Sequence, residues 1–398
     1  MTETTTTAGV LASVRALLPA IADRAAEAED LRKVPETTIK ELTDTGFFRL
    51  LQPKRYGGYA ADPTVFYDAV KEIAQACGST GWVASVVGVH PWHVGLYEKR
   101  AQDEVWGVSG ERADTRISSS YAPTGKVTPV DGGFRLSGRW HFSSGCDHTQ
   151  WVILGALVPD ADGNLVDMRS FLLPRADYEI KDVWDTVGLR GTGSNDVVVE
   201  DVFVPEHRAL SFGPVTALTP PGAEVNPDPL YKLPYASVFT TTISTPIVGI
   251  AQGAWSGFVA ATRERIRVSY GQKVAEDPFA QIRLARAASD IDAAWRQLRG
   301  NIAEMYELAC AGAPLTVELR ARARRDQVLA TERAAAAVDL LMENAGGNAM
   351  RTGAGPAGVQ RAWRDVHTGR GHAANDPERA LLIYGQDALG LEIQDVML

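Results

Sequence analysis

The chain has 398 residues, of which 45% are hydrophobic and 22% charged, and its 49 acidic and 40 basic side chains give a formal net charge of −9. This composition is typical of a soluble globular protein, and it excludes a disordered or collagen-like chain and argues against a nucleic-acid partner. Its apolar runs are too short to cross a membrane, and its first residues lack the features of a signal peptide, so we expect a cytoplasmic protein with no membrane contact.

Residues 1–115 have the pattern of a helical domain. Val10, Val14 and Ile21 recur at helical spacing, and Pro35 and Gly46 mark the start and end of a second helix. Two further helical stretches are predicted over residues 63–77 and 81–97.

Residues 116–212 have the pattern of a β-domain. From Phe134 to Phe142 every second residue is apolar or glycine, which predicts a half-buried strand with Phe142 on its inner face. Further strands are predicted over residues 151–158, 170–174 and 197–205. We expect a small antiparallel domain or barrel.

Residues 213–242 are predicted to form a loop, because six prolines fall between positions 214 and 234. Residues 243–398 return to a helical pattern, with helices expected over 245–270, 279–311, 316–345 and 357–371. The predicted fold class is therefore α+β, with helices at both ends and strands between them.

Several common motifs are absent, among them the phosphate-binding loop, the zinc-binding HExxH sequence and the GxSxG nucleophile motif. His90 and His93 lie three residues apart on one predicted helix and could share a metal. No further ligand follows at matching spacing, so we expect no metal site.

This order of segments resembles the acyl-CoA dehydrogenase fold, in which an N-terminal helical domain, a central antiparallel β-barrel domain and a C-terminal four-helix bundle surround a flavin. The matching segments are SSSYAPTG at 118–125, WHFSSG at 140–145 and the pair Arg364-Asp365. Many of these dehydrogenases carry a catalytic glutamate nine residues after that arginine. This chain has Ala373 there, which cannot abstract a proton.

Within this fold, the chain resembles the oxygenase components of two-component flavin-dependent aromatic monooxygenases, over nearly its whole length. The segments that carry the resemblance are CGSTGWVASVVGVHPWH, RISSSYAPTG, WHFSSGCDH, VGLRGTGSN and HAANDPERA. It is most similar to the branch that hydroxylates a phenolic secosteroid in the degradation of cholesterol rings.

The resemblance implies the following reaction. A separate NAD(P)H-dependent reductase supplies reduced flavin, which reacts with O2 to give a C4a-hydroperoxide, and the phenol is hydroxylated ortho to its hydroxyl to give a catechol. FMN is the favoured flavin, with FAD possible. Three alternatives remain: a hydroxylase of smaller phenols of the p-hydroxyphenylacetate type, an acyl-CoA dehydrogenase with a displaced base, and a non-enzymatic protein that binds flavin or acyl-CoA.

The resemblance also implies the cofactor site. Arg265 is expected to contact the flavin phosphate, and Gly347 and Asn348 to reach the cofactor of a neighbouring subunit, which implies a homotetramer. The full set of expected cofactor contacts is Trp82, Ser119, Ser120, Tyr121, Phe142, Ser143, Ser144, Arg265, Gly347, Asn348, His372 and Ala373.

Three residues are expected to act in the chemistry. His372 is the candidate base for the phenol proton, because histidine titrates nearest to neutral pH. The alternative is that His372 only caps or packs against a helix end. Ser143, or its neighbour Ser144, is expected at flavin N5, and His93, or His90, on the oxygen side of the flavin.

Overall fold

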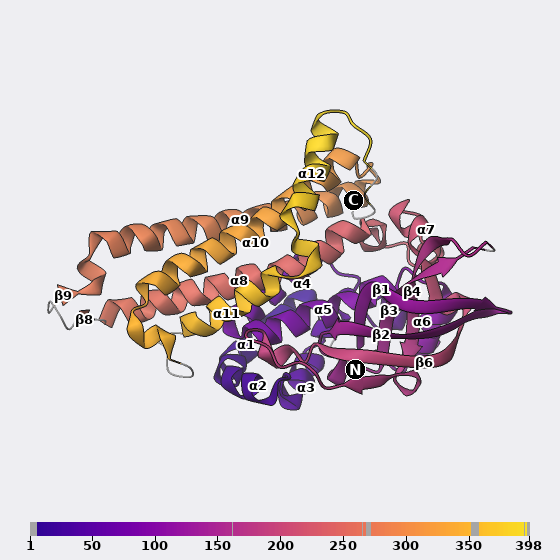
Figure 1. Ribbon diagram of the computed structural model, residues 1–398, viewed down its shortest axis with the longest axis horizontal. Helices are drawn as coiled ribbons and strands as arrows, with labels where there is room; N and C mark the ends of the chain where they lie inside the picture. The colour runs from indigo at the N-terminus through magenta and orange to yellow at the C-terminus, as the bar shows by residue number, and fades with distance from the viewer. Residues whose placement is uncertain are drawn as a thin grey trace.

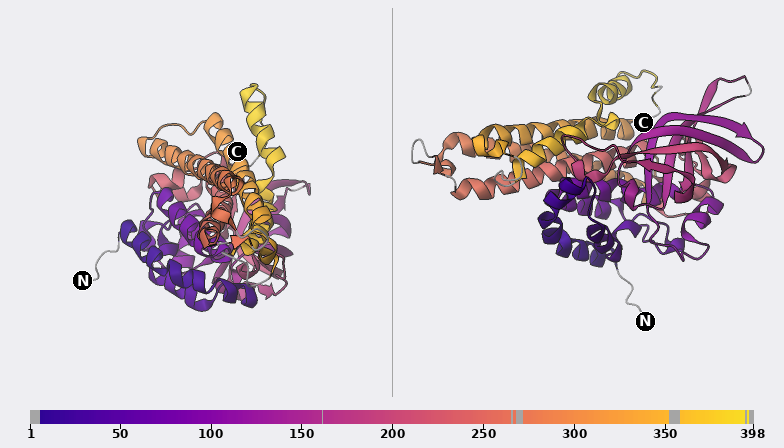
Figure 2. Two further views of the ribbon diagram at one scale, coloured as in Figure 1. Left: turned by 90° about the vertical axis from the view of Figure 1, so that its left-hand side faces the viewer. Right: turned by 60° about the horizontal axis from the view of Figure 1, so that its bottom comes forward.

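The computed structural model describes residues 6–160, 162–264, 266–267, 272–351, 358–393 and 395. Its N-terminal helices and its sheet lie at one end of a long C-terminal helical bundle (Figure 1). The right-hand view of Figure 2 shows the bundle helices extending well past the N-terminal helices. Among the described residues, no helix is both long and apolar enough to span a membrane.

The N-terminal part is helical, as predicted. Asp62 caps the fourth helix by accepting a hydrogen bond from Thr64 N, and Pro63 occupies its first position. The sixth helix was not predicted. The helices are α1 (Thr7–Asp23), α2 (Ala25–Leu31), α3 (Glu36–Asp44), α4 (Pro63–Ala76), α5 (Gly78–Val94) and α6 (Lys99–Trp106).

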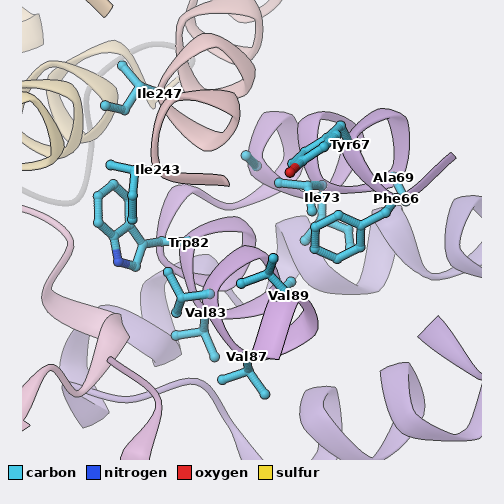
Figure 3. Close-up of a cluster of buried hydrophobic side chains, with 14 of the residues drawn as sticks. Phe66, Tyr67, Ala69, Ile73, Trp82, Val83, Val87, Val89, Ile243 and Ile247 are labelled. Atoms are coloured by element: carbon cyan, nitrogen blue, oxygen red, sulfur yellow. The ribbon is translucent and has the colours of Figure 1, made fainter. Parts of the chain in front are cut away.

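Helix α5 is the central element of the core, because all 17 of its residues are buried. A Cβ added at Gly81 would lie 2.3 Å from Ala74 Cα, so the glycine lets α4 and α5 approach closely. On the other side, Trp82 of α5 points toward Ile243 of the first bundle helix (Figure 3). The helix therefore holds Trp82, His90 and His93 in fixed positions.

The sheet has seven strands in the order β5-β6-β2-β1-β3-β4-β7. Most neighbours are antiparallel, as predicted, but β1 and β3 are parallel, with Ile117 opposite Trp151. The chain returns from β2 through residues 144–150 to the other side of β1 before β3 begins, so the sheet is mixed. The strands are β1 (Ile117–Val130), β2 (Gly133–Ser143), β3 (Trp151–Pro159), β4 (Leu165–Pro174), β5 (Glu179–Lys181), β6 (Asn195–Pro205) and β7 (Ala209–Ser211).

The end of β2 departs from the predicted alternation. The pairing of β2 with β6 shifts between Trp140 and Ser143, and Phe142 adopts a left-handed φ of 66°. As a result Phe142 is 69% exposed and Ser143 is fully buried. The prediction that Phe142 lies on the inner face was wrong, because a bulge reverses the two sides of the strand.

The proline-rich segment is shorter than predicted. It contains α7 (Phe212–Thr216) and two short 3-10 helices, and α8 begins at Tyr235, directly after Pro234, so residues 235–242 are helical. Helix α12, capped by Asp376, was not predicted. The remaining C-terminal helices are α8 (Tyr235–Glu264), α9 (Pro278–Ala311), α10 (Val317–Asn344), α11 (Val359–Arg370) and α12 (Pro377–Ala388).

Candidate active site

Two buried histidines of α5 face strand β1. His90 Nδ1 lies 2.7 Å from the Ile117 carbonyl oxygen, so this nitrogen carries the hydrogen, and Nε2 accepts from Ser119 Oγ at 2.8 Å. Burial lowers the pKa of His90 to about 4 and that of His93 well below its usual value. Both rings are therefore neutral at neutral pH.

His93 forms one side of an aromatic cluster. Its Nδ1 lies 2.6 Å from the Tyr121 hydroxyl, and its ring centroid lies 5.0 Å from that of Tyr235. Tyr235 in turn stacks on Phe239 with a centroid distance of 5.6 Å. Tyr121, Phe212 and Phe239 are only partly buried, which indicates accessible space beside them. Such walls suit a flat aromatic guest.

His372 lies beyond Phe239, with ring centroids 6.2 Å from Phe239 and 6.0 Å from Trp82. Its Nδ1 accepts a hydrogen bond from Ala374 N at 3.0 Å, so the neutral ring carries its hydrogen on Nε2. Desolvation lowers the pKa of His372 to about 4. The ring is thus a hydrogen-bond donor at Nε2, and gaining a proton at Nδ1 would break its bond to Ala374.

The two serines after Phe142 have different surroundings. Ser143 Oγ is buried and has no hydrogen-bond partner among the residues that the structure describes. Ser144 Oγ accepts from Trp82 Nε1 at 3.1 Å and lies 2.6 Å from Ser194 Oγ. Ser144 therefore lies on the side of the strand that faces Trp82 and His372.

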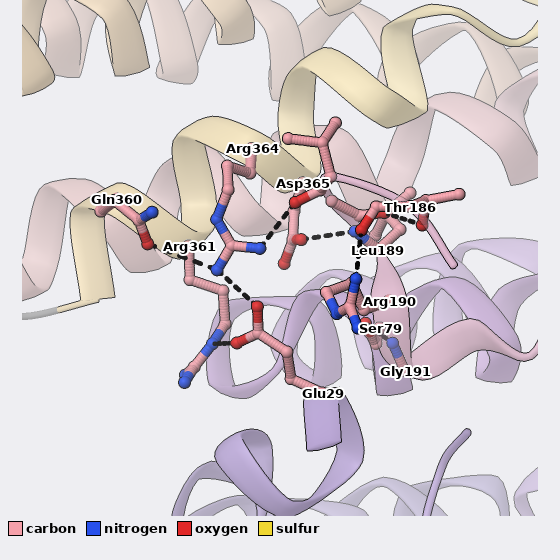
Figure 4. Close-up of polar contacts among 12 residues, drawn as sticks. Glu29, Ser79, Thr186, Leu189, Arg190, Gly191, Gln360, Arg361, Arg364 and Asp365 are labelled. Carbon is pink, nitrogen blue, oxygen red and sulfur yellow. Dashed lines mark hydrogen bonds and ion pairs between the residues drawn. The ribbon is translucent and has the colours of Figure 1, made fainter. Parts of the chain in front are cut away.

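The loop that carries Ser194 is tied to the bundle and to the N-terminal helices. Asp365 Oδ1 of α11 accepts from Leu189 N at 2.6 Å, and Ser79 Oγ of α5 accepts from Gly191 N at 3.1 Å (Figure 4). Burial raises the pKa of Asp365 to about 6. Sequence analysis singled out the segment GLRGTGSN but assigned no site residue in it.

The structure brings together six of the thirteen predicted residues, namely Trp82, His93, Ser119, Tyr121, Ser144 and His372. Ser120 uses its hydroxyl within the sheet, where it donates to the His141 carbonyl oxygen at 2.7 Å. Gly347 and Asn348 are exposed in the short 3-10 helix that follows α10. Ala373 follows His372 and is exposed.

Arg265 lies outside the described residues. Within the described part of the chain, no group of three or more His, Cys, Asp or Glu side chains is arranged to hold a metal ion. The functional roles assigned to the individual site residues stay predictions.

The arrangement of helices, sheet and bundle around this site defines the acyl-CoA dehydrogenase class. Residues 6–104 match the family model "Acyl-CoA dehydrogenase, N-terminal domain", and residues 241–377 match "Acyl-CoA dehydrogenase, C-terminal domain". These matches account for both helical parts of the chain.

Within this class, the chain is similar to flavin-dependent hydroxylases. The Flavin-dependent monooxygenase, oxygenase subunit HsaA of Rhodococcus jostii (strain RHA1) is 56% identical over 383 residues, which is 96% of this chain and 98% of that protein. The crystal structure of 3-HSA hydroxylase from Rhodococcus sp. RHA1 has a TM-score of 0.93 and 55% identity, covering 98% of this chain and 99% of that one. XiaF from Streptomyces sp., in complex with FADH2 and glycerol, has a TM-score of 0.87 and 29% identity, and the match covers 98% of this chain and 97% of that one. The chain belongs to the family of flavin-dependent monooxygenase oxygenase subunits.

Proposed function

We propose that the protein uses reduced flavin and O2 to hydroxylate a phenolic secosteroid ortho to its hydroxyl, giving a catechol in steroid ring degradation. The observation that carries this proposal is the buried, neutral His93 ring bonded to the partly buried Tyr121, which faces an aromatic cluster that ends at His372. The similarity to the protein described as 3-HSA hydroxylase supports the substrate class.

The residues around Ser144 fit a flavin ring. Phe142 presents an exposed aromatic face, and Ser144 offers an oxygen beside Trp82 and within reach of the His372 side of the cluster. We propose that Phe142, Ser144, Trp82 and His372 hold the isoalloxazine. When bound in its reduced form, the flavin supplies the activation of O2. FMN is the proposed cofactor and FAD the alternative.

The aromatic cluster fits the phenol. Phe212, Tyr235 and Phe239 provide apolar faces that exclude water, and the Tyr121 hydroxyl, bonded to His93, orients the phenolic oxygen. His372 remains the proposed base for the phenol proton, a role that requires the neutral ring to carry its hydrogen on Nδ1 and to give up the bond from Ala374 N. Its Nε2–H geometry supports a second possibility, in which His372 donates a hydrogen bond toward the flavin.

Acyl-CoA dehydrogenation is not supported by the residues beside His372. Ala373 occupies the position of the dehydrogenase glutamate, and the nearby Asp376 carboxylate accepts from Glu378 N and Arg379 N at the start of α12. A carboxylate engaged in capping a helix is poorly placed to abstract a substrate proton.

The proposal is tested by mixing the protein with chemically reduced FMN or FAD, oxygen and a panel of phenols that includes phenolic steroids. Catechol detected by mass spectrometry, with none from matched compounds that lack the hydroxyl, is the expected result. Failure to hydroxylate any phenol, or bleaching of tightly bound FAD by an acyl-CoA, would overturn the proposal.

We also propose that a separate NAD(P)H-dependent reductase supplies the flavin. The name "oxygenase subunit" of the similar proteins supports this division of labour. The purified protein should then be nearly colourless and should not oxidise NADH by itself. Stoichiometric yellow flavin that survives gel filtration, or NADH oxidation by the protein alone, would contradict it.

A further inference from the structure

Three hydroxyl groups form a continuous hydrogen-bonded row behind Trp82. Ser144 Oγ lies 2.6 Å from Ser194 Oγ, and Ser194 Oγ lies 2.6 Å from Thr192 Oγ1. Thr192 Oγ1 then lies 2.9 Å from the carbonyl oxygen of Leu189. All three hydroxyl residues are buried, with exposed fractions of 9%, 4% and 1% in the order given.

The direction of donation along this row follows from its ends. Each hydroxyl has one hydrogen to donate, and the Leu189 carbonyl oxygen can only accept. When Thr192 donates to Leu189, Ser194 must donate to Thr192, and Ser144 must donate to Ser194. In the opposite direction the hydrogen of Ser144 would have no acceptor among the described residues, which is costly for a buried group. The first direction satisfies every hydroxyl.

The acceptor at the end of the row is held in place by neighbouring elements. Leu189 has a left-handed φ of 50°, its N–H donates to Asp365 of α11, and its carbonyl oxygen also accepts from Trp184 Nε1 at 2.9 Å. Figure 4 shows this anchoring of the loop against α11. The fold therefore sets the direction of hydrogen-bond donation, which runs from Ser144 toward the Leu189 carbonyl oxygen.

The consequence falls on Ser144. Its hydrogen is committed to Ser194, and one of its lone pairs accepts from Trp82 Nε1. Toward any further ligand, Ser144 Oγ can therefore act only as an acceptor. Reduced flavin carries a hydrogen on N5, whereas oxidised flavin has only a lone pair at that atom.

We propose that Thr192 and Ser194 are positioning residues that fix Ser144 as an acceptor and so make the site selective for reduced flavin over oxidised flavin. This inference rests on the proposed function, in which Ser144 meets the flavin ring. It names two residues outside the predicted cofactor contacts and explains how an oxygenase could release oxidised flavin to its reductase without a conformational change.

The test is a pair of dissociation constants for FMN, one oxidised and one photoreduced under anaerobic conditions, measured by protein fluorescence. Thr192→Val keeps the shape of the side chain and removes the link to Leu189, so Ser194 and then Ser144 can reverse their hydrogens. Loss of one oriented hydrogen bond predicts that the preference for reduced FMN falls about three- to tenfold. Ser194→Ala should reduce the preference for reduced FMN by a similar factor. Combining Thr192→Val with Ser194→Ala should lower this preference little further.

Thr186→Val is the matched control. Thr186 lies in the same loop and also donates to a backbone carbonyl, that of Gly188, at 2.9 Å, but it has no link to Ser144. Its variant should leave the ratio of the two constants unchanged. An equal change in the control, or an unchanged ratio in both row variants while Ser144→Ala alters it, would overturn the positioning role. If Ser144→Ala also left both constants unchanged, the proposed flavin site itself would be wrong.

Discussion

At the residue scale, Ser143 and Ser144 differ in what their hydroxyls contact, although they are adjacent and chemically identical. Ser143 Oγ has no partner among the described residues, so Ser143→Ala removes no hydrogen bond and should leave the free energy of unfolding nearly unchanged. Ser144→Ala removes bonds to both Trp82 and Ser194 and should cost about 1–2 kcal/mol. Urea unfolding of the two variants measures the difference.

The same two variants, Ser143→Ala and Ser144→Ala, test which of the two serines lies at flavin N5. Sequence analysis placed Ser143 or its neighbour Ser144 there, and the contacts of Ser144 with Trp82 and Ser194 favour Ser144. Ser144→Ala should increase hydrogen peroxide formation from reduced flavin and O2, while Ser143→Ala should not. The reverse outcome would restore the original assignment of Ser143.

His372→Ala tests the two roles proposed for that ring. If His372 removes the phenol proton, the variant should consume reduced flavin at a near-normal rate but form about 10²–10⁴-fold less catechol. Because phenols ionise near pH 10, raising the pH should partly restore the product. If His372 instead donates from Nε2 to the flavin, flavin oxidation without phenol should change, and high pH should give no recovery. Stopped-flow absorbance together with catechol yield distinguishes these cases.

At the element scale, the close approach of α4 and α5 sets the position of every α5 site residue. A methyl group at Gly81 would meet the backbone of Ala74, which has no room to move inside the core. Gly81→Ala should therefore destabilise the protein by about 1–3 kcal/mol and weaken flavin binding, because Trp82 is the next residue. Thermal unfolding and flavin titration measure the two effects.

Gly300 provides the control for this prediction. It lies within helix α9, is exposed, and has nothing within 4 Å of an added Cβ. Gly300→Ala should stabilise the protein by up to about 1 kcal/mol through helix propensity alone. Equal effects of the two substitutions would contradict the packing argument.

At the scale of the whole molecule, buried neutral histidines make stability depend on pH. The pKa of His90 is about 4 in the folded protein, against 6.5 when exposed, so between these values the unfolded chain binds more protons. Stability should fall as the pH drops from 6.5 toward 4, by about 3 kcal/mol from His90, with a further loss from His93. Unfolding midpoints measured from pH 7 to 5 should decrease.

Asp365 acts in the opposite direction. Its pKa is about 6 in the folded protein, against 3.8 when exposed, so the folded chain binds its proton first and acidification through this range favours folding. Asp365→Asn should therefore steepen the acid-induced loss of stability. A flat pH profile in the Asp365→Asn variant would contradict the neutral state of the histidines.

Assembly is the second prediction at this scale. Gly347 and Asn348 are exposed in the short 3-10 helix that follows α10, and we propose that they contribute to the flavin site of a neighbouring subunit. We expect a homotetramer by light scattering at micromolar concentration. Asn348→Ala should weaken flavin binding without altering the mass. A fully active monomer would exclude a shared site.

Sequence periodicity by itself determined many of the helices and strands, although not α6, α12 or the start of α8, because burial of one face repeats every 3.6 or 2 residues along the chain. The helical spacing of Val10, Val14 and Ile21, and the alternation from Phe134, are local signals of this kind. The motif resemblance likewise determined the family. The domain limits at residues 115 and 212 stay predictions, whereas the loop predicted to reach residue 242 ends where α8 begins at Tyr235.

Only the tertiary structure decided which side chains meet. The bulge that exposes Phe142 and buries Ser143 arises from the pairing of β2 with β6, a partner more than fifty residues away that alternation within one strand cannot reveal. The parallel pairing of β1 with β3 depends on the path of the connection between β2 and β3. The row from Ser144 through Ser194 and Thr192 to Leu189 exists because β6 brings its preceding loop beside the end of β2. Local sequence sets backbone preference and burial, whereas contacts between distant segments set the donor, the acceptor and the accessible face of each site residue.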